Sequence, residues 1–398
     1  MKISYFNYHY DIEGQAIGAA AQVRALAAAL ARQGHRVDLQ FRAARRPEAD
    51  RGYLGLKKST ILRRFGHVPR LLWRNLAFLR QELRLLRNFR PDVLLAVSSY
   101  CNFSALLAAR RLGLPFVLFT EAPLEYEYAL FFRQYYRYPL LGRGVEGLTI
   151  RGADQVICIS DILKGYLMRY GVPAVKLHVV PNGVDHLAFR PQPADSQVRE
   201  RFGLQNRLVL GYIGSFEFFG DIPRFLELAR IVCARYPQVV FFLVGGGARG
   251  EELRRQAAAG GLADHFIFPG RVPHDQVPAF LSIMDLVICP YKDDYLFYNS
   301  SMKLLEYMAA GKTGLFPALG QIKELVADGY NGMLHEPGDY QTMADKLLEL
   351  IDNEPLRQQL GANARRTIER NWTWDHQAAR ITRVLELAAA GRKQEKTG

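Results

Sequence analysis

The sequence predicts an α/β protein with two doubly wound parallel sheets. Short apolar runs typical of buried strands alternate with helical segments along nearly the whole chain, and such alternation requires parallel strands joined by right-handed crossovers. The alternation occurs twice, and residues 179–197, rich in Pro, Asn, Gly and Asp, separate the two series in the manner of a hinge. The length of 398 residues suits about two to three domains.

The first series opens with a strand at Lys2 to Phe6, a glycine-containing loop and a helix from about Ala19 to Arg32, as a Rossmann-like unit does. Further strands are expected in GHRVDLQF, RPDVLLAVSS, LPFVLFTE and DQVICIS. The second series comprises RLVLGYIG, VVFFLVGGG, HFIFPG, LVICPY, TGLFP and GMLHEPGD. Because ligands of open α/β sheets bind at the carboxyl ends of the strands, we expect a cleft lined by those ends. No clean G-x-G-x-x-G follows the first strand, which disfavours a dehydrogenase.

The charge indicates an anionic partner. The chain has 52 basic and 39 acidic residues, a net charge of +13, and most of the excess lies between Phe41 and Leu112. A helix expected over 68–89 places arginines on one face and leucines on another: Arg70, Arg74, Arg80, Arg84 and Arg87 against Leu72, Leu76, Leu79, Leu83 and Leu86. This helix either docks on an anionic membrane leaflet or is an ordinary surface helix. Nucleic acid is disfavoured, because no nucleic-acid-binding fold is recognised and the rest of the chain is not basic.

Localisation follows from what the sequence lacks. No run of eighteen apolar residues occurs, and the first residues, MKISYFNYHY, contain no apolar leader region. We expect a cytoplasmic protein that is peripheral on the inner face of the plasma membrane. The four cysteines are far apart, so neither a zinc site nor a disulfide framework is expected.

The segment NSSMKLLEYMAAGK, residues 299–312, carries the most chemistry. Ser300 or Ser301 can cap a helix whose unpaired amides and dipole would stabilise a diphosphate. Glu306, one turn into the helix on the face of Lys303, can accept hydrogen bonds from both hydroxyls of a ribose. Its alternative role in a capping box is disfavoured, because the position three residues earlier holds Lys303 rather than Ser or Thr.

Several segments in this order resemble glycosyltransferase family 4: HVVPNGVD, GYIGSF, VGGG, FPGRVPHDQVPAFLSIMDLVICPY and SSMKLLEYMAAGK. The resemblance covers nearly all of the chain. It implies the GT-B fold and transfer of a sugar from a UDP- or GDP-sugar with retention of configuration, without a metal ion or other cofactor. It also implies an acceptor-binding domain over 1–185, a nucleotide-sugar-binding domain over 186–370, and a C-terminal helix over 371–398 that packs back toward the first domain.

The resemblance assigns donor-binding roles to particular residues. It implies that Glu306 holds the ribose, that the main chain at Gly214 and Ser215 approaches the diphosphate, and that Arg271 and Val272 contact the base. The phosphate would be received at the helix start, at Ser300, Ser301 and Met302.

The sequence also departs from the family pattern. Tyr298 stands where the first glutamate of a pair is usual, and Phe219, Gly220 and Asp221 occupy the place of a usual basic residue. Loss of a group that stabilises the leaving group costs about 3 to 4 kcal/mol. Lys303, Lys292 or Arg249 could supply the missing charge, and we count Tyr298 and Lys303 among the candidate catalytic residues.

Glu121 and His9, both in the first half of the chain, are candidates for the acceptor site. Glu121 follows the strand LPFVLF and can bind or deprotonate an acceptor hydroxyl, or merely begin a loop. His9, after the first strand, can contact the acceptor or a phosphate. Aromatic residues between Tyr126 and Tyr138 either stack on sugars or a lipid chain or belong to the core.

The function expected is therefore sugar transfer from a nucleoside diphosphate sugar to a glycan or lipid-linked acceptor, in surface polysaccharide or glycolipid synthesis. Two alternatives stay open. The departures favour a non-catalytic scaffold subunit that binds nucleotide or glycan, and the same fold also serves sugar-nucleotide epimerases.

Overall fold

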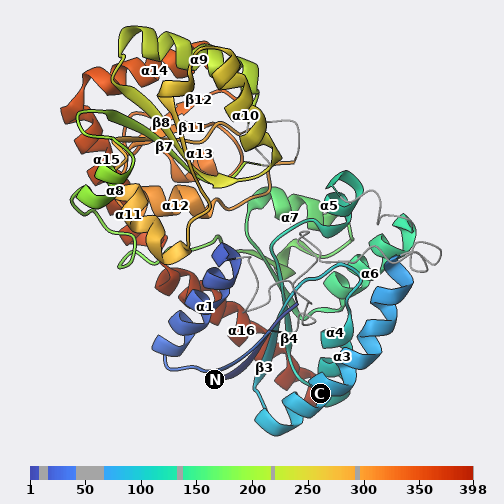
Figure 1. Ribbon diagram of the computed structural model, residues 1–398. Helices are drawn as coiled ribbons and strands as arrows, with labels where there is room; N and C mark the ends of the chain where they lie inside the picture. Colours follow the sequence, from blue (N-terminus) through green and yellow to red (C-terminus); the bar gives the residue numbers. More distant parts are fainter. Residues whose placement is uncertain (9–16, 42–66, 132–137, 217–219, 292–295, 398) are drawn as a thin grey trace. The chain divides into compact units, whose positions relative to one another are not determined.

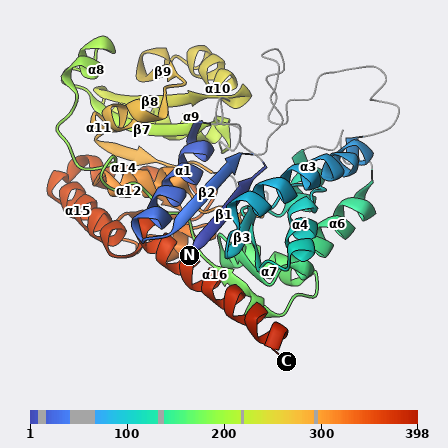
Figure 2. The same ribbon diagram turned by 90° about the horizontal axis from the view of Figure 1, so that it is seen from below.

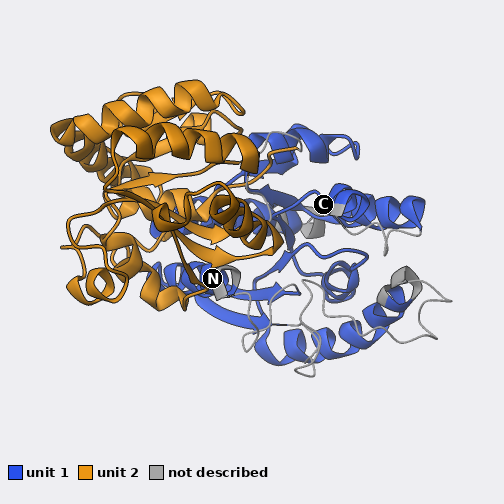
Figure 3. Ribbon diagram, turned by 45° about the horizontal axis from the view of Figure 1, so that its top comes forward, with its two compact units in different colours: residues 1–181, 375–398 blue, residues 182–374 orange. Residues whose placement is uncertain are grey.

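The computed structural model describes residues 1–8, 17–41, 67–131, 138–216, 220–291 and 296–397. The chain divides into two compact units (Figure 3): Met1–Pro181 with Asp375–Gly398, and Asn182–Trp374. Each unit contains a six-stranded sheet whose paired strands are all parallel. The predicted fold class, two doubly wound α/β halves, is confirmed.

Unit 1 has the strand order β2-β1-β3-β4-β5-β6. The strands are β1 (Lys2–Asn7), β2 (Arg36–Phe41), β3 (Val93–Val97), β4 (Phe116–Thr120), β5 (Gln155–Cys158) and β6 (Leu177–Val179). The helices are α1 (Ile17–Arg32), α3 (His67–Phe89), α4 (Ser104–Leu112), α5 (Leu124–Phe131), α6 (Pro139–Gly152), α7 (Asp161–Met168), the 3-10 turn η2 (Ala174–Lys176) and, after unit 2, α16 (Trp374–Thr397).

Unit 2 has the strand order β12-β11-β10-β7-β8-β9. The strands are β7 (Leu208–Ser215), β8 (Val239–Gly246), β9 (Phe266–Gly270), β10 (Leu286–Ile288), β11 (Gly314–Pro317) and β12 (Met333–His335). The helices are α8 (Ser196–Arg201), α9 (Ile222–Arg235), α10 (Ala248–Ala259), α11 (Val277–Ser282), α12 (Met302–Ala309), α13 (Ile322–Leu325), α14 (Tyr340–Asp352) and α15 (Glu354–Asn371), with 3-10 turns η3 (Ala263–His265) and η4 (His274–Gln276).

The strand order of unit 2 fixes where a ligand can bind. Chain progression reverses between β7 and β10, and this switch point is where open α/β sheets leave a crevice at their carboxyl edge. Apolar side chains cover both faces of the sheet, with α9, α10 and α14 over one face and α11 and α12 over the other (Figure 1). Burial on both faces explains why the strands are continuous apolar runs.

The boundaries between the units differ by a few residues from the expected divisions at 185 and 370. Asn182 and Val184 belong to unit 2, because Asn182 bonds Ser300 and the Val184 amide donates to the Trp372 carbonyl at 3.0 Å. The chain returns to unit 1 at Asp375 rather than at 371.

Helix α16 packs on elements of unit 1, to which most of it belongs (Figure 2). Near its start, Arg32 of α1 pairs with Asp375 at 2.7 Å. Near its end, Arg392 pairs with Asp154, just before β5, at 3.1 Å. The side chains of Arg32 and Asp375 are each about half exposed, whereas those of Arg392 and Asp154 are mostly covered. Because solvent screens an exposed ion pair, the Arg392–Asp154 pair contributes more to the attachment of α16.

Helix α3 matches the expected basic helix, with one difference. Leu79 and Leu86 are buried as expected, but Leu76 is 53% exposed and Trp73 is 74% exposed. Both lie on the helix face of the exposed Arg80 and Arg84, since the positions are separated by three or four residues. Leu76, which we expected on the buried leucine face, is therefore exposed beside the arginines together with Trp73. No described helix is both long enough and apolar enough to span a bilayer.

Candidate functional site

The carboxyl edge of the sheet in unit 2 gathers most of the predicted donor-binding residues. Helix α12 is fixed to β7 by Tyr307, whose buried hydroxyl accepts from the Ile213 amide at 2.6 Å. This attachment brings the start of α12 to the glycine turn after β7. A Cβ atom at Gly214 would lie 2.5 Å from Lys303 Nζ, so Lys303 lies against the Gly214 backbone. Gly214 has φ +152 and leaves room that another residue would fill.

The start of α12 is capped by Ser301 and not by Ser300. The Ser301 side chain accepts from the Leu304 amide, and Met302 is the first helical residue. Ser300 instead accepts from the Asn182 amide at 2.9 Å, while the Asn182 side chain donates to the Ser300 carbonyl at 3.0 Å. Asn182 thus anchors the peptide that leads into α12, a role that was not predicted from the sequence.

Lys303 lies between two tyrosine rings. Its ammonium is 4.4 Å from the centre of the Tyr212 ring and 4.9 Å from that of Tyr291, and it donates to the Tyr212 hydroxyl at 2.8 Å. Tyr212 donates in turn to the Ser215 carbonyl. Burial raises the pKa of both tyrosines, so they stay neutral and hold the cation by their ring faces. A positive charge is therefore held at the glycine turn by groups that do not neutralise it.

Glu306 is largely buried and has a partner that was not predicted from the sequence. Its Oε1 lies 2.9 Å from Nε2 of His274, and the side chain is 10% exposed. The hydrogen bond to Glu306 raises the pKa of His274, with further contributions from the charges of Glu306, Asp275 and Asp185, against the opposing effect of burial. The only sign of this partner in the sequence is that His274 lies three residues after Arg271, in the segment expected to contact the base.

The segment after β9 lies at the same edge. Arg271 is exposed, and its side chain covers Gly246, where a Cβ atom would lie 2.9 Å from Arg271 Nε. Gly246 pairs with Ser215 across the β7–β8 ladder, so Arg271 is close to the predicted diphosphate turn. Val272 packs on the core of unit 2.

The candidate replacements for the usual basic residue differ in position. Arg249 donates to the Gly220 carbonyl at 2.5 Å and holds the segment before α9. Asp221 caps α9 by accepting from the Arg224 amide. Lys292 and Phe219 lie outside the described residues. Tyr298 is 5% exposed, and its catalytic role stays a prediction.

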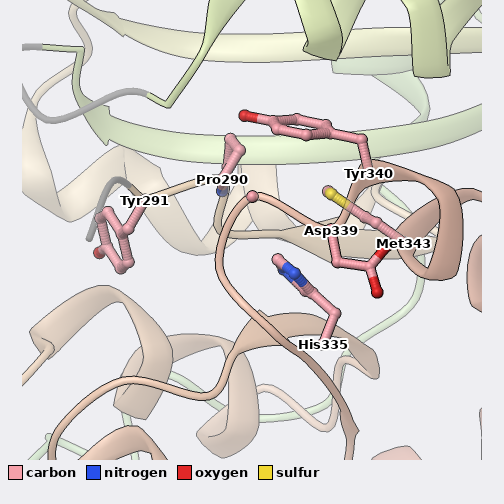
Figure 4. Close-up of a pocket in the computed structure, with 7 residues that line it drawn as sticks. Pro290, Tyr291, His335, Asp339, Tyr340 and Met343 are labelled. Carbon is pink, nitrogen blue, oxygen red and sulfur yellow. The ribbon is translucent and has the colours of Figure 1, made fainter. Parts of the chain in front are cut away.

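A small cavity lies beside this edge, lined by Pro290, Tyr291, His335, Gly338, Asp339, Tyr340 and Met343 (Figure 4). His335, between Tyr291 and Asp339 in this view, is buried, which lowers its pKa. Its Nδ1 bonds the Glu336 carbonyl at 2.9 Å. Tyr291 therefore borders both this cavity and Lys303.

In unit 1, Glu121 lies directly after β4, at the carboxyl edge of that sheet. Gln22 of α1 donates to its Oε1 at 2.8 Å, which fixes the carboxylate. His9 lies outside the described residues. Of the aromatic run, Tyr128 is buried and stacks on Tyr100 at 3.6 Å between ring centres, which places this member in the core.

No group of three or more potential metal ligands lies together among the described His, Cys, Asp and Glu residues. The four cysteines are buried thiols. That the reaction needs no metal stays a prediction from the resemblance.

Two family models match the chain in succession. Glycosyltransferase Family 4 matches residues 17–186, and Glycosyl transferases group 1 matches residues 195–367. The chain belongs to glycosyltransferase family 4.

Individual relatives agree with this assignment. The chain is 24% identical over 298 residues to the alpha-D-kanosaminyltransferase of Streptomyces kanamyceticus, covering 71% of this chain and 74% of that protein. It is 31% identical over 250 residues to the phosphatidyl-myo-inositol mannosyltransferase of Mycolicibacterium smegmatis, covering 61% of this chain and 60% of that protein. The second match thus spans less than two thirds of the relative's length. Both names confirm the expected enzyme class, a hexosyltransferase-type glycosyltransferase.

A solved structure confirms the GT-B fold. HepE of Anabaena, determined in complex with UDP, superposes with a TM-score of 0.68 at 20% identity, over 97% of this chain and 100% of that chain.

The close packing of the two glycine turns gives a testable prediction for this family 4 chain. A Cβ atom at Gly245 would lie 1.9 Å from the Gly214 carbonyl oxygen, a backbone atom, and Gly245 has φ +143. We expect Gly245→Ala to displace the Gly214 turn, to destabilise unit 2 by about 1 to 3 kcal/mol and to weaken nucleotide binding.

Urea unfolding and calorimetric titration with UDP and GDP measure the two effects. Gly165→Ala is the matched control, because Gly165 lies in helix α7 and a Cβ atom added there would have nothing within 4 Å. Unchanged stability and binding in Gly245→Ala would contradict the geometry of the turn.

Proposed function

We propose that this glycosyltransferase moves a sugar from a UDP- or GDP-sugar to a glycan or lipid-linked acceptor, with retention of configuration, in surface polysaccharide or glycolipid synthesis. The observation that carries the proposal is the arrangement along α12. The capped start of the helix, Lys303 and Glu306 lie within two turns of one another at the switch point of the sheet. A nucleoside diphosphate requires anion-stabilising groups beside a carboxylate that accepts from ribose hydroxyls.

In this proposal the diphosphate lies at the backbone amides that begin α12, beside the Gly214 turn and the Lys303 ammonium. As the bond between the anomeric carbon and the diphosphate breaks, negative charge develops on the leaving oxygen. Lys303 and the helix start stabilise this charge, without a metal ion. The acceptor oxygen bonds to the anomeric carbon on the same face, and its proton passes to the leaving diphosphate. Both UDP in the HepE complex and the resemblance support a nucleotide ligand.

The acceptor is proposed to bind unit 1. Glu121, held by Gln22 at the sheet edge, is placed to accept a hydrogen bond from an acceptor hydroxyl. His9 is proposed to contact the acceptor or a phosphate. The phosphatidyl-myo-inositol named for one relative supports an acceptor attached to a lipid.

A second candidate function is a non-catalytic subunit that binds nucleotide or glycan. Tyr298 and Phe219, in place of the usual glutamate and basic residue, favour it. A sugar-nucleotide epimerase is the other alternative, and it would convert the donor without any acceptor.

Turnover with a panel of UDP- and GDP-sugars, with and without membrane extract as a source of acceptor, separates these functions. We expect transfer that depends on the extract, and we expect Glu306→Ala to weaken nucleotide binding by about tenfold or more, since each lost hydrogen bond to a charged group costs about 1.5 to 3 kcal/mol. Nucleotide binding with neither transfer nor donor hydrolysis would support the scaffold. Conversion of the donor alone would support the epimerase.

Lys303→Met tests the proposed stabilisation of the leaving group. It removes the charge but keeps a flexible chain between the tyrosine rings, so we expect kcat to fall by about two to three orders of magnitude while KM changes little. Lys323→Met, which removes an exposed lysine on α13, is the control. A kcat within about threefold of the unaltered enzyme would exclude this role for Lys303.

We also propose that α3 docks unit 1 on an anionic bilayer at the cytoplasmic face of the plasma membrane. The exposed Trp73 and Leu76 lie on one face with Arg80 and Arg84, which is the composition of a helix that lies in a membrane interface.

Cosedimentation with vesicles of phosphatidylcholine and phosphatidylglycerol tests this docking. Substitution of Arg80 and Arg84 together by Ala should weaken binding about thirtyfold, at about 1 kcal/mol for each charge, and Trp73→Ala should weaken it further. Leu187→Ala, which removes a 70% exposed leucine of unit 2, should have no effect. Equal binding to vesicles of phosphatidylcholine alone would argue against electrostatic docking.

A further inference from the structure

His274 connects the segment proposed to contact the base with the residue proposed to hold the ribose. It begins the turn η4, two residues after Val272, and its Nε2 lies 2.9 Å from Glu306 Oε1 on α12. A carboxylate only accepts hydrogen bonds, so Nε2 carries the proton that joins the two side chains. This bond joins η4 to α12, although the two residues are 32 positions apart in the sequence.

The His274 ring is partly covered by unit 2 and has acidic groups around it. The ring is 28% exposed and lies 5.5 Å from the Phe189 ring, centre to centre. Phe189 is buried, and it belongs to the segment that enters unit 2. Among the described residues, the charged groups that act on the imidazole are Glu306 of α12, Asp275 of its own turn and Asp185 of the entering segment. All three are acidic, so the charged form of the imidazole is favoured.

The geometry points to His274 as the positioning residue of the donor site: it orients Glu306 so that the carboxylate accepts from the ribose of a nucleoside diphosphate. A carboxylate has about four acceptor positions on its two oxygens. His274 occupies one of them at Oε1, which leaves Oε2 and the second position of Oε1 for the two ribose hydroxyls. The inference rests on the proposed function, because it assigns a role at the same site.

Orientation is needed because Glu306 is a carboxylate with little exposure to water. A buried carboxylate without a hydrogen-bond donor is costly, and it would turn toward whatever donor or water is within reach. The imidazole supplies that donor in a fixed direction before any nucleotide binds. His274 itself does not contact the reacting atoms in this arrangement.

The arrangement makes nucleotide binding depend on pH. The hydrogen bond and charge of Glu306, with Asp275 and Asp185, raise the pKa of His274 above its usual 6.5. The charge-assisted bond is therefore fully present below pH 6.5 and is lost as the pH rises through the raised pKa. A neutral imidazole still donates to the carboxylate, but the imidazolium adds a charge–charge attraction that the neutral ring lacks.

Calorimetric titration with UDP and with GDP, from about pH 6 to about pH 9, tests the inference. His274→Ala should weaken binding about tenfold at the acidic end. His274→Gln supplies a neutral amide donor, so its affinity should be within about threefold of the unaltered protein at pH 9 and fall behind by about tenfold at pH 6. The result is read as the ratio of the affinity of His274→Gln to that of the unaltered protein at each pH. The nucleotide's own phosphate titrates in the same way in both measurements, so its effect cancels in this ratio.

The matched control is His265→Gln. His265 lies just before β9, at the opposite edge of the same sheet, and its Nδ1 bonds the Val239 carbonyl at 2.9 Å. This variant should leave both the affinity and its pH dependence unchanged. In the Glu306→Gln background, adding His274→Ala should weaken nucleotide binding little further, because the two side chains act as one unit.

Nuclear magnetic resonance titration of the His274 ring gives a second readout that needs no ligand. Its pKa should fall toward 6.5 in Glu306→Gln. A constant affinity ratio across the pH range, equal affinities of His274→Ala and the unaltered protein, or an unchanged His274 pKa in Glu306→Gln would each overturn the inference. If Glu306→Ala abolishes nucleotide binding but the His274 variants bind as the unaltered protein does, the inference is wrong and the proposed function stands. An unaltered protein that binds neither nucleotide overturns the proposed function, and the inference with it.

Discussion

The attachment of α12 to β7 is the constraint on which the candidate site depends. The Tyr307 hydroxyl both accepts from the Ile213 amide and donates to the Ile213 carbonyl, in a position that is 1% exposed. Burial raises the pKa of Tyr307 well above its usual value, so the hydroxyl keeps the proton that it donates. Because the helix is rigid, this one attachment also fixes Ser301, Lys303 and Glu306 relative to the Gly214 turn.

In the proposed mechanism, Lys303 takes the place of the basic residue that is usual after the glycine turn. A charge that is useful to a leaving diphosphate must be near the turn and must not be neutralised by a neighbouring carboxylate. Among the described residues, the printed contacts of the Lys303 ammonium are with neutral tyrosines, the Tyr212 and Tyr291 rings and the Tyr212 hydroxyl. Arg249, in contrast, lies 3.9 Å from a Glu252 oxygen and donates to a backbone carbonyl, so it serves better to hold the chain before α9.

The sequence predicted the fold well because the strands are apolar runs with no competing period. It also predicted the helix that begins near Ser301, since capping and helical spacing are local properties. It could not assign the cap to Ser301 rather than Ser300, because that choice depends on Asn182, which is distant in the chain. Nor could it find the His274–Glu306 bond, which joins residues 32 positions apart. The sequence could not predict the exposure of Leu76 either, since that depends on which elements pack against α3.

The central claim is that the start of α12 binds the diphosphate of a nucleotide sugar while Glu306 binds its ribose. The most direct measurement is a crystal structure of the protein soaked with UDP or GDP. Our account predicts phosphate oxygens within hydrogen-bonding distance of the backbone amides of Met302 and Lys303, with both ribose hydroxyls on the Glu306 carboxylate. Nucleotide density elsewhere on unit 2, with the start of α12 occupied only by solvent, would contradict it.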